Sequence, residues 1–139
     1  MRIRLSNLQR KHAIPRRRAA AIAARILRRF HVRRGELSVV FVGAARMRRI
    51  NRQYHRRDRV TDVLAFDLRL SAQCRRDTLI GDVIIAPAVA ARTARRYGHT
   101  YTEELLTYVA HGVLHLLGYR DGTVKERHRM ERLQKVLVQ

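Results

Sequence analysis

The 139-residue sequence has one cysteine, two prolines, no tryptophan and no long apolar run. A single cysteine, Cys74, cannot form an internal disulfide, which fits a reducing compartment. Cys74 lies in the polar stretch SAQCRRD, so we expect a loop residue and not a metal ligand. No segment approaches the ~20 consecutive apolar residues of a membrane span, and the first residues, MRIRLSNLQR, lack the apolar core of a signal peptide. We therefore expect a cytoplasmic protein without a membrane segment.

Acidic residues are also scarce. The sequence has 11 Asp and Glu against 31 Lys and Arg, which gives a formal net charge of +20, carried mostly by arginine. Arginine pairs with phosphate in a bidentate way and stacks on bases. A genome rich in Arg and Ala codons would explain arginine over lysine, but not this net charge. We predict a phosphate-rich partner. A DNA-binding module is the weaker alternative, because neither helix-turn-helix nor zinc-finger spacing occurs.

Apolar residues recur at helix or strand spacing along most of the chain, which shows no internal repeat or linker. The pattern predicts one α/β domain over residues 1–139, with a small mixed four-stranded sheet, about five helices and the histidine helix near the C-terminus. The first two strands should be parallel and the middle two antiparallel, while the strand order stays open. The predicted strands are Met1–Leu5, Leu37–Val42, Val63–Leu68 and Leu79–Ile85. The predicted helices follow Pro15, span Ala44–His55 and Pro87–Tyr97, follow a capping box at Thr100–Glu103, and span Val124–Leu137.

The most specific pattern is His111-Gly-Val-Leu-His115, followed by Gly118 and Asp121. Residues four apart share one face of a helix, so the two imidazoles should point the same way. Gly118 can end that helix, and the next turn can return Asp121 to the imidazoles. Histidines at this spacing are often ordinary helix residues. The glycine and aspartate at matching offsets favour a site for one Zn²⁺, or for another divalent metal, with an open coordination position.

The spacing is that of the metzincin peptidases, H-E-x-x-H-x-x-G-x-x-H, with two changes. Gly112 replaces the glutamate that takes a proton from water in those enzymes, and Asp121 replaces the last histidine. Peptide hydrolysis by that mechanism is therefore not expected. A general base must come from the metal hydroxide, a substrate phosphate or another side chain. Glu104, on the same helix face as His111, is either an acceptor for an imidazole N–H or a solvated surface carboxylate.

Three more segments precede the histidine motif HGVLHLLGY, namely Asn51-x-x-Tyr54, TDVLAF at 61–66 and LIGDVIIAP at 79–87. In this order the motifs resemble the bacterial YbeY family from about Val39 to Val136. That family is described as metal-dependent, single-strand-specific endoribonucleases that mature ribosomal RNA. The resemblance implies an α/β fold, a zinc site of three histidines, ribosomal RNA as substrate and a cytoplasmic location.

The sequence departs from the family pattern at the third metal ligand, where Asp121 stands in place of the usual histidine. An alternative alignment makes His128 the ligand. We favour Asp121, because His128 falls well into the last predicted helix and loses the offset from Gly118. Three further family positions also differ, the usual Asp, Pro and Ser being replaced by Arg120, Val60 and Ala65.

A second departure concerns the family's Tyr-Arg pair, which reads Tyr54-His55 in this chain. Histidine holds no permanent charge at neutral pH, because its ordinary pKa is about 6.5. We expect His55 and Arg56 to be catalytic. His55 is the side-chain candidate for the base, beside the metal hydroxide and a substrate phosphate, and Arg56 or Arg57 would neutralise charge on the phosphate. Arg57 and Tyr54 are the expected substrate-binding residues, by phosphate pairing and base stacking.

The sequence thus predicts a zinc-dependent endoribonuclease of ribosomal RNA maturation and ribosome quality control. His111, His115 and Asp121 would hold the metal, single-stranded RNA would be the substrate, and ribosomal proteins are candidate partners. The rival is a non-catalytic, RNA-binding ribosome assembly factor that keeps the fold and a structural metal. This rival has more support here than it would have for a typical family member, because positions 55 and 121 depart from the family pattern.

Overall fold

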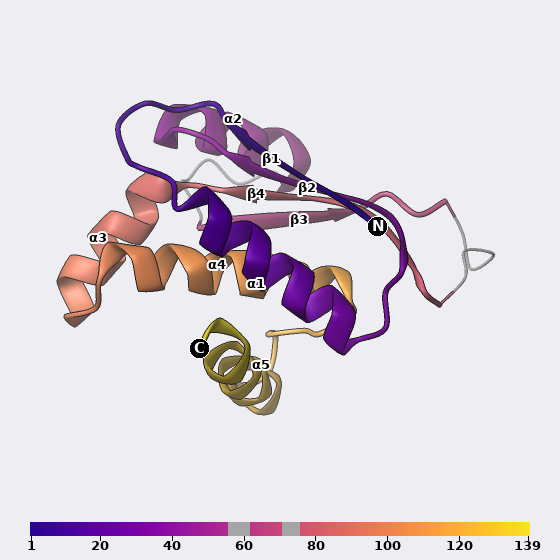
Figure 1. Ribbon diagram of the computed structural model, residues 1–139. Coiled ribbons are helices and arrows are strands. Elements are labelled where there is room, and N and C mark those ends of the chain that lie inside the picture. Colours follow the sequence, from indigo (N-terminus) through magenta and orange to yellow (C-terminus); the bar gives the residue numbers. More distant parts are fainter. Residues whose placement is uncertain (56–61, 71–75) are drawn as a thin grey trace.

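The computed structural model describes residues 1–55, 62–70 and 76–139 (Figure 1). Within these ranges the elements follow the predicted β-α-β-α-β-β-α-α-α order. The strands are β1 (Arg2–Asn7), β2 (Arg34–Phe41), β3 (Val63–Asp67) and β4 (Thr78–Ile85). The helices are α1 (Arg16–Arg29), α2 (Ala44–His55), α3 (Pro87–Tyr97), α4 (Tyr101–Leu116) and α5 (Val124–Val138). Cys74, Arg56 and Arg57 lie outside the described residues.

The four strands form one mixed sheet in the order β1-β2-β4-β3. β1 and β4 both pair with β2 in parallel, and β3 pairs with β4 in antiparallel orientation. The α/β class and both strand orientations are as predicted. The strand order had not been predicted from the apolar pattern. In the structure β3 lies at one edge of the sheet, and β4 lies between β3 and β2. The structure also starts β2 at Arg34, three residues before the apolar run, because Arg34–Glu36 continue the ladder opposite Thr78–Ile80.

Helices cover the two faces of the sheet unequally. α1 and α4 lie on one face and α5 packs outside α4, whereas α2 lies on the other (Figure 1). The larger core is shared by the sheet and the α1–α4 layer, with Leu37, Val39, Phe41, Val83 and Ile85 pointing into it. The smaller core lies under α2 and contains Val42, Met47, Leu64 and Ala86. Among the described residues no helix is long and apolar enough to cross a membrane.

The α4 helix is the best buried helix and lies directly on the sheet. Its apolar stripe is buried: Leu105, Leu106, Val109, Val113 and Leu116 are each at most 3% exposed. Two glycines permit the close approach. A Cβ added at Gly112 of α4 would lie 2.3 Å from Val83 Cγ1, and one added at Gly81 of β4 would lie 2.8 Å from Leu116 Cδ1. The histidine helix is thus held in a fixed position against β4.

Threonine side chains cap the N-terminal ends of α4 and α5. Thr100 caps α4 by accepting a bond from the backbone N–H of Glu103, at 3.1 Å. The full capping box is found not there but at α5, where the Thr123 side chain bonds the Glu126 backbone and the Glu126 carboxylate bonds the Thr123 backbone. The sequence reading of a box at Thr100 was therefore half correct, and the Thr-x-x-Glu signal at Thr123 was missed.

Candidate metal centre

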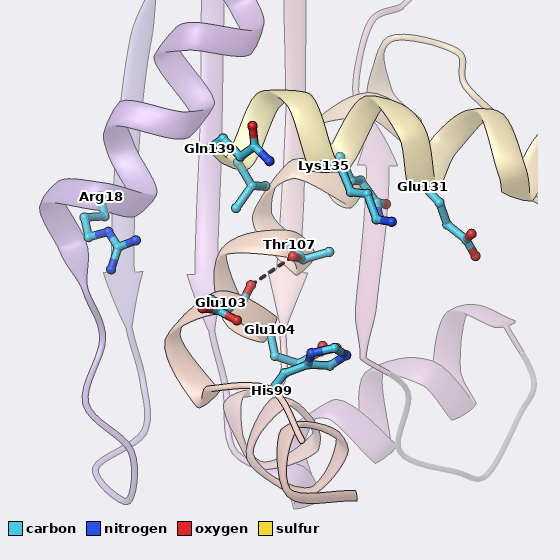
Figure 2. A pocket seen from close by; sticks show the side chains of 10 residues that line it. Arg18, His99, Glu103, Glu104, Thr107, Glu131, Lys135 and Gln139 are labelled. Atoms are coloured by element: carbon cyan, nitrogen blue, oxygen red, sulfur yellow. Dashed lines mark hydrogen bonds between the residues drawn. The ribbon is translucent and has the colours of Figure 1, made fainter. Parts of the chain in front are cut away.

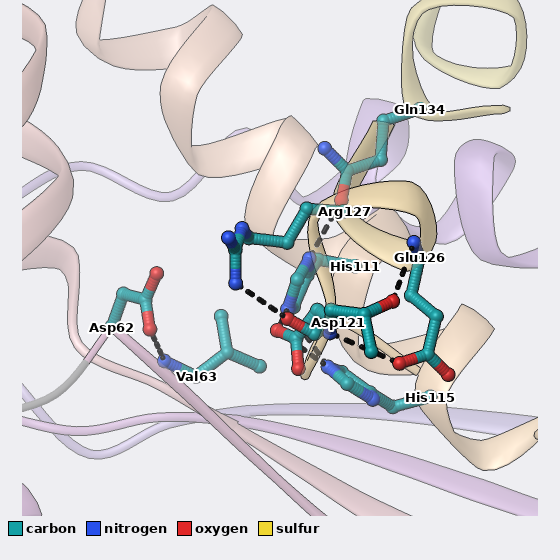
Figure 3. Close-up of polar contacts among 9 residues, drawn as sticks. Asp62, Val63, His111, His115, Asp121, Glu126, Arg127 and Gln134 are labelled. Atoms are coloured by element: carbon teal, nitrogen blue, oxygen red, sulfur yellow. Dashed lines mark hydrogen bonds and ion pairs between the residues drawn. The ribbon is translucent and has the colours of Figure 1, made fainter. Parts of the chain in front are cut away.

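Three side chains converge at the C-terminal end of α4. His111 and His115 project from adjacent turns and Asp121 returns from the turn beyond (Figure 3). The Asp121 Oδ2 atom lies 3.3 Å from the Nε2 atom of each histidine. The two Nε2 atoms are 2.9 Å apart. The predicted trio is thus brought together, with the Nε2 atoms of both imidazoles facing one carboxylate oxygen.

These separations fit a shared metal ion. Ligands about 2.0–2.1 Å from a tetrahedral ion lie about 3.3–3.4 Å from one another. The distance of 3.3 Å from Asp121 Oδ2 to each histidine Nε2 matches this ligand-to-ligand separation. The 2.9 Å between the two Nε2 atoms corresponds to an angle near 90° at the ion. The donor set, two imidazole nitrogens and one carboxylate oxygen, suits zinc and other divalent ions of similar preference. The side chains of His111 and His115 are 23% and 28% exposed, which leaves the cluster open to a substrate.

The turn after α4 delivers Asp121. Gly118 has φ +99°, a conformation that side chains disfavour. The Tyr119 N–H bonds the Leu114 carbonyl and the Gly118 N–H bonds the His115 carbonyl, which together form a Schellman motif. The role predicted for Gly118 is therefore confirmed. The capping box of α5 begins two residues after Asp121, so the turn is fixed at both ends.

The position that holds a glutamate in the metzincins points into the sheet here. A Cβ at Gly112 would contact Val83 of β4 and Val63 of β3. The absence of a base at this position is thus a packing requirement, since no side chain fits between α4 and β4 there. Val63 is itself held at the start of β3 by a bond from its N–H to Asp62 Oδ1, at 2.8 Å.

A glutamine that sequence reasoning did not identify contacts the cluster. His111 Nδ1 lies 2.6 Å from Gln134 Oε1 on α5. Glu104, for which an acceptor role had been the alternative to a surface carboxylate, is not the partner of His111 Nδ1. The available sequence signal was the helical spacing of Met130, Gln134 and Leu137, which places a polar side chain in the buried stripe of α5.

An arginine was also missed. Arg127, in the first turn of α5, directs its guanidinium to the edge of the cluster (Figure 3). Its Nη1 donates to the backbone carbonyl of Asp121 at 3.4 Å. The side chain is exposed. No spacing rule links position 127 to the histidines, because the contact depends on how α5 is oriented after the turn.

The predicted substrate residues lie elsewhere or outside the described residues. Tyr54 is 61% exposed near the end of α2, with its ring 5.4 Å from that of Phe66. The two rings line a hollow of about 390 Å³ on the α2 side of the sheet, opposite α4. His55 is the last residue of α2, but its side chain, like Arg56 and Arg57, lies outside the described residues. The structure therefore does not bring Tyr54 together with the metal cluster.

Asp82, on β4, also lines the hollow beside Tyr54. Burial, and then the charge of Glu36, raise the pKa of its carboxyl. The hollow is thus mainly apolar with one carboxyl group on its wall.

A larger cavity, of about 700 Å³, lies between α1, α4 and α5 (Figure 2). Three glutamates line it, Glu103, Glu104 and Glu131, together with Arg18 and Lys135. Gln134 lines it as well, so the cavity reaches the residue that contacts His111. The cavity itself contains neither metal-ligand candidate of α4.

Comparisons with known proteins agree with this architecture. A family model described as Endoribonuclease YbeY matches residues 4–139. A Geobacter metallireducens protein named Endoribonuclease YbeY is 37% identical over 135 residues, covering 94% of this chain and 89% of that protein. One of the same name from an Anaeromyxobacter species is 37% identical over 137 residues, covering 99% and 70%.

Among solved structures, a Thermotoga maritima protein studied in solution has the same fold, with a TM-score of 0.64 at 24% identity. The match covers 98% of this chain and 86% of that one. The fold, the order of the motifs and the length of the match lead to one assignment: this chain belongs to the YbeY family.

Proposed function

We propose that this protein is a metal-dependent, single-strand-specific endoribonuclease that acts in ribosomal RNA maturation and ribosome quality control. The observation that carries the proposal is the convergence of three metal-binding atoms, separated by 2.9 to 3.3 Å, on a partly open surface. The relatives are named as endoribonucleases, which supports RNA as the substrate. The whole chain, 1–139, would form one catalytic domain working in the cytoplasm.

His111, His115 and Asp121 would hold one metal ion per chain, and we propose zinc. A divalent ion held there would supply Lewis acidity, which activates water and polarises a phosphodiester. Gln134 would keep the Nε2 atom of His111 directed at the ion. Arg127 stands at the edge of the cluster, where its guanidinium can pair with a phosphate oxygen.

Residues at the end of α2 and directly after it would complete the site. His55 would accept a proton from the attacking water, because Gly112 offers no base. Arg56 would neutralise charge that develops on the phosphate, and Arg57 and Tyr54 would bind other parts of the RNA. The remaining arginine surface would hold the phosphate backbone without reading sequence.

The alternative is an RNA-binding assembly factor that cuts nothing. The departures at His55 and Asp121 are what favour it. The complete donor set and the relatives' names support the enzyme instead. Ribosomal proteins remain candidate partners under both readings.

A nuclease assay separates the two readings. Single-stranded and structured RNA of ribosomal sequence would be incubated with the protein as purified, after chelation, and after adding back Zn²⁺ or Mn²⁺. We expect cleavage of the single strand, its loss on chelation and its return with metal. Binding without cleavage in all three states would establish the assembly factor. Cleavage that survives chelation would contradict the metal mechanism.

A further inference from the structure

The two nitrogens of His111 face different partners. Nε2 points to Asp121 and His115, while Nδ1 lies 2.6 Å from the amide oxygen of Gln134, both side chains being partly buried. An amide oxygen can only accept a hydrogen bond. The short contact therefore requires the proton of a neutral His111 on Nδ1, which leaves the lone pair on Nε2 for a metal.

We propose that Gln134 is a positioning residue for the metal centre, which fixes both the tautomer and the ring orientation of His111. This inference rests on the proposed metal-binding role of the cluster. Imidazole ligands commonly donate their second N–H to such a partner, and loss of the partner typically weakens metal binding 10- to 100-fold. Nothing else among the described residues is recorded within hydrogen-bond distance of His111 Nδ1.

The packing of α5 explains why Gln134 can do this. Met130 and Leu137, one turn to either side, are 2% and 4% exposed and belong to the main core. These anchors orient the helix face that carries Gln134. The capping box at Thr123 fixes the first turn of the same helix. Gln134 is thus the polar member of an otherwise apolar stripe, and its amide is aimed at α4.

The choice of an amide has an electrostatic consequence. With two neutral imidazoles and one carboxylate, a divalent ion leaves the cluster with a net charge of +1, which favours binding of a phosphate. A carboxylate at position 134 would cancel that charge. Gln134 therefore holds His111 in place without reducing the attraction for RNA.

The test uses Gln134→Leu, Gln134→Glu and a matched control, Gln139→Leu, which makes the same change at an exposed position after α5. Zn²⁺ affinity is measured by competition with a chromophoric chelator, and the tautomer of His111 by ¹⁵N NMR at mildly alkaline pH without metal. Thermal melts followed by circular dichroism check the fold.

We expect Gln134→Leu to bind Zn²⁺ about 10 to 100 times more weakly and to lose the single Nδ1–H tautomer. Gln134→Glu should keep that tautomer and the Zn²⁺ affinity but bind single-stranded RNA more weakly in the metal-loaded form. Gln139→Leu should match the parent. Parental affinity and tautomer in Gln134→Leu would overturn the inference. A parent that takes up no Zn²⁺ would instead refute the proposed metal site, while the NMR measurement would still decide the role of Gln134.

Discussion

The Cα of Gly112 lies so close to Val83 that a Cβ built on it would stand 2.3 Å from Val83 Cγ1. At Gly112 the helix that carries His111 and His115 therefore rests directly on the Val83 side chain of β4, with no α4 side chain between them. This contact fixes the height of both imidazoles above the sheet. It also explains why glycine, and not the glutamate of the metzincins, stands at position 112.

The first prediction tests this contact. Gly112→Ala should lower the free energy of unfolding by about 1–3 kcal/mol, because the added methyl group overlaps Val83. Urea denaturation measures the change. Gly43→Ala is the matched control, since a Cβ at Gly43 meets nothing within 4 Å. The double variant Gly112→Ala, Val83→Ala should lose less stability than the two single changes added together. Strict additivity would show that the two residues do not share the contact.

The second prediction concerns the third ligand. Asp121→Ala removes one of three donors, so Zn²⁺ affinity should fall and RNA cleavage should decrease at least about 100-fold. RNA binding measured without metal should change little, because most phosphate contacts lie elsewhere on the basic surface. Asp121→His should keep or raise activity, because it restores the donor typical of the family. Undiminished cleavage by Asp121→Ala would place any nuclease activity at another site or in a contaminant.

The third prediction follows from the net charge of +20. Affinity for single-stranded RNA should fall steeply with salt, with a slope of about −0.7 in log K against log salt for each phosphate neutralised. Fluorescence anisotropy across a salt series measures the slope, and several phosphates should contribute. Arg127→Gln should make the slope shallower by about one such increment, because it removes one proposed phosphate contact. A slope near zero for the parent would rule out a phosphate-binding role for the charge.

The fourth prediction concerns acid stability. The hydrogen bond from Arg69 lowers the pKa of Asp67, with burial opposing it. A carboxylate with a lowered folded pKa stabilises the protein above its unfolded pKa, and this contribution is lost as the pH falls through the folded value. Asp67→Asn should therefore be less stable than the parent at neutral pH, by less than about 1 kcal/mol because the pair is partly exposed. The difference should begin to shrink below about pH 4 and vanish once the pH is below the lowered folded pKa of Asp67.

Urea titrations of parent and variant across this pH range provide the measurement. A difference that stays constant down to about pH 3 would contradict the assignment. Arg69 also donates to the carbonyl of Leu116 at 3.0 Å, so Arg69→Met should cost more than Asp67→Asn.

Local signals in the sequence were sufficient for most of the fold. Pro15, Pro87, Gly98 and Gly118 mark helix ends through backbone restrictions that act within a few residues. Alternating and continuous apolar runs located all four strands. The strand order could not be obtained in this way, because which strand lies beside β2 depends on packing between residues distant in the chain.

The same distinction applies to the candidate site. His111, His115 and Asp121 could be grouped because one helix turn and one glycine turn join them. Gln134 and Arg127 could not, because they reach the cluster through the orientation of α5 against α4. The roles predicted for Tyr54, His55, Arg56 and Arg57 remain predictions.

The parallel pairing of β2 with β4 also bears on how the protein folds. Arg34 of β2 pairs with Thr78 of β4, and α2 and β3 lie between these two strands in the chain. The central ladder therefore forms only after this intervening segment has been brought into a loop. Closing such a long loop costs entropy before any contact repays it, and non-local pairing of this kind slows folding. The histidine helix α4 packs on β4, and Gln134, which contacts His111, lies on α5, the last element of the chain. A nascent or partly folded chain would therefore hold its sheet incomplete and its histidines unaligned, so that any nuclease activity would arise only in the last steps of folding.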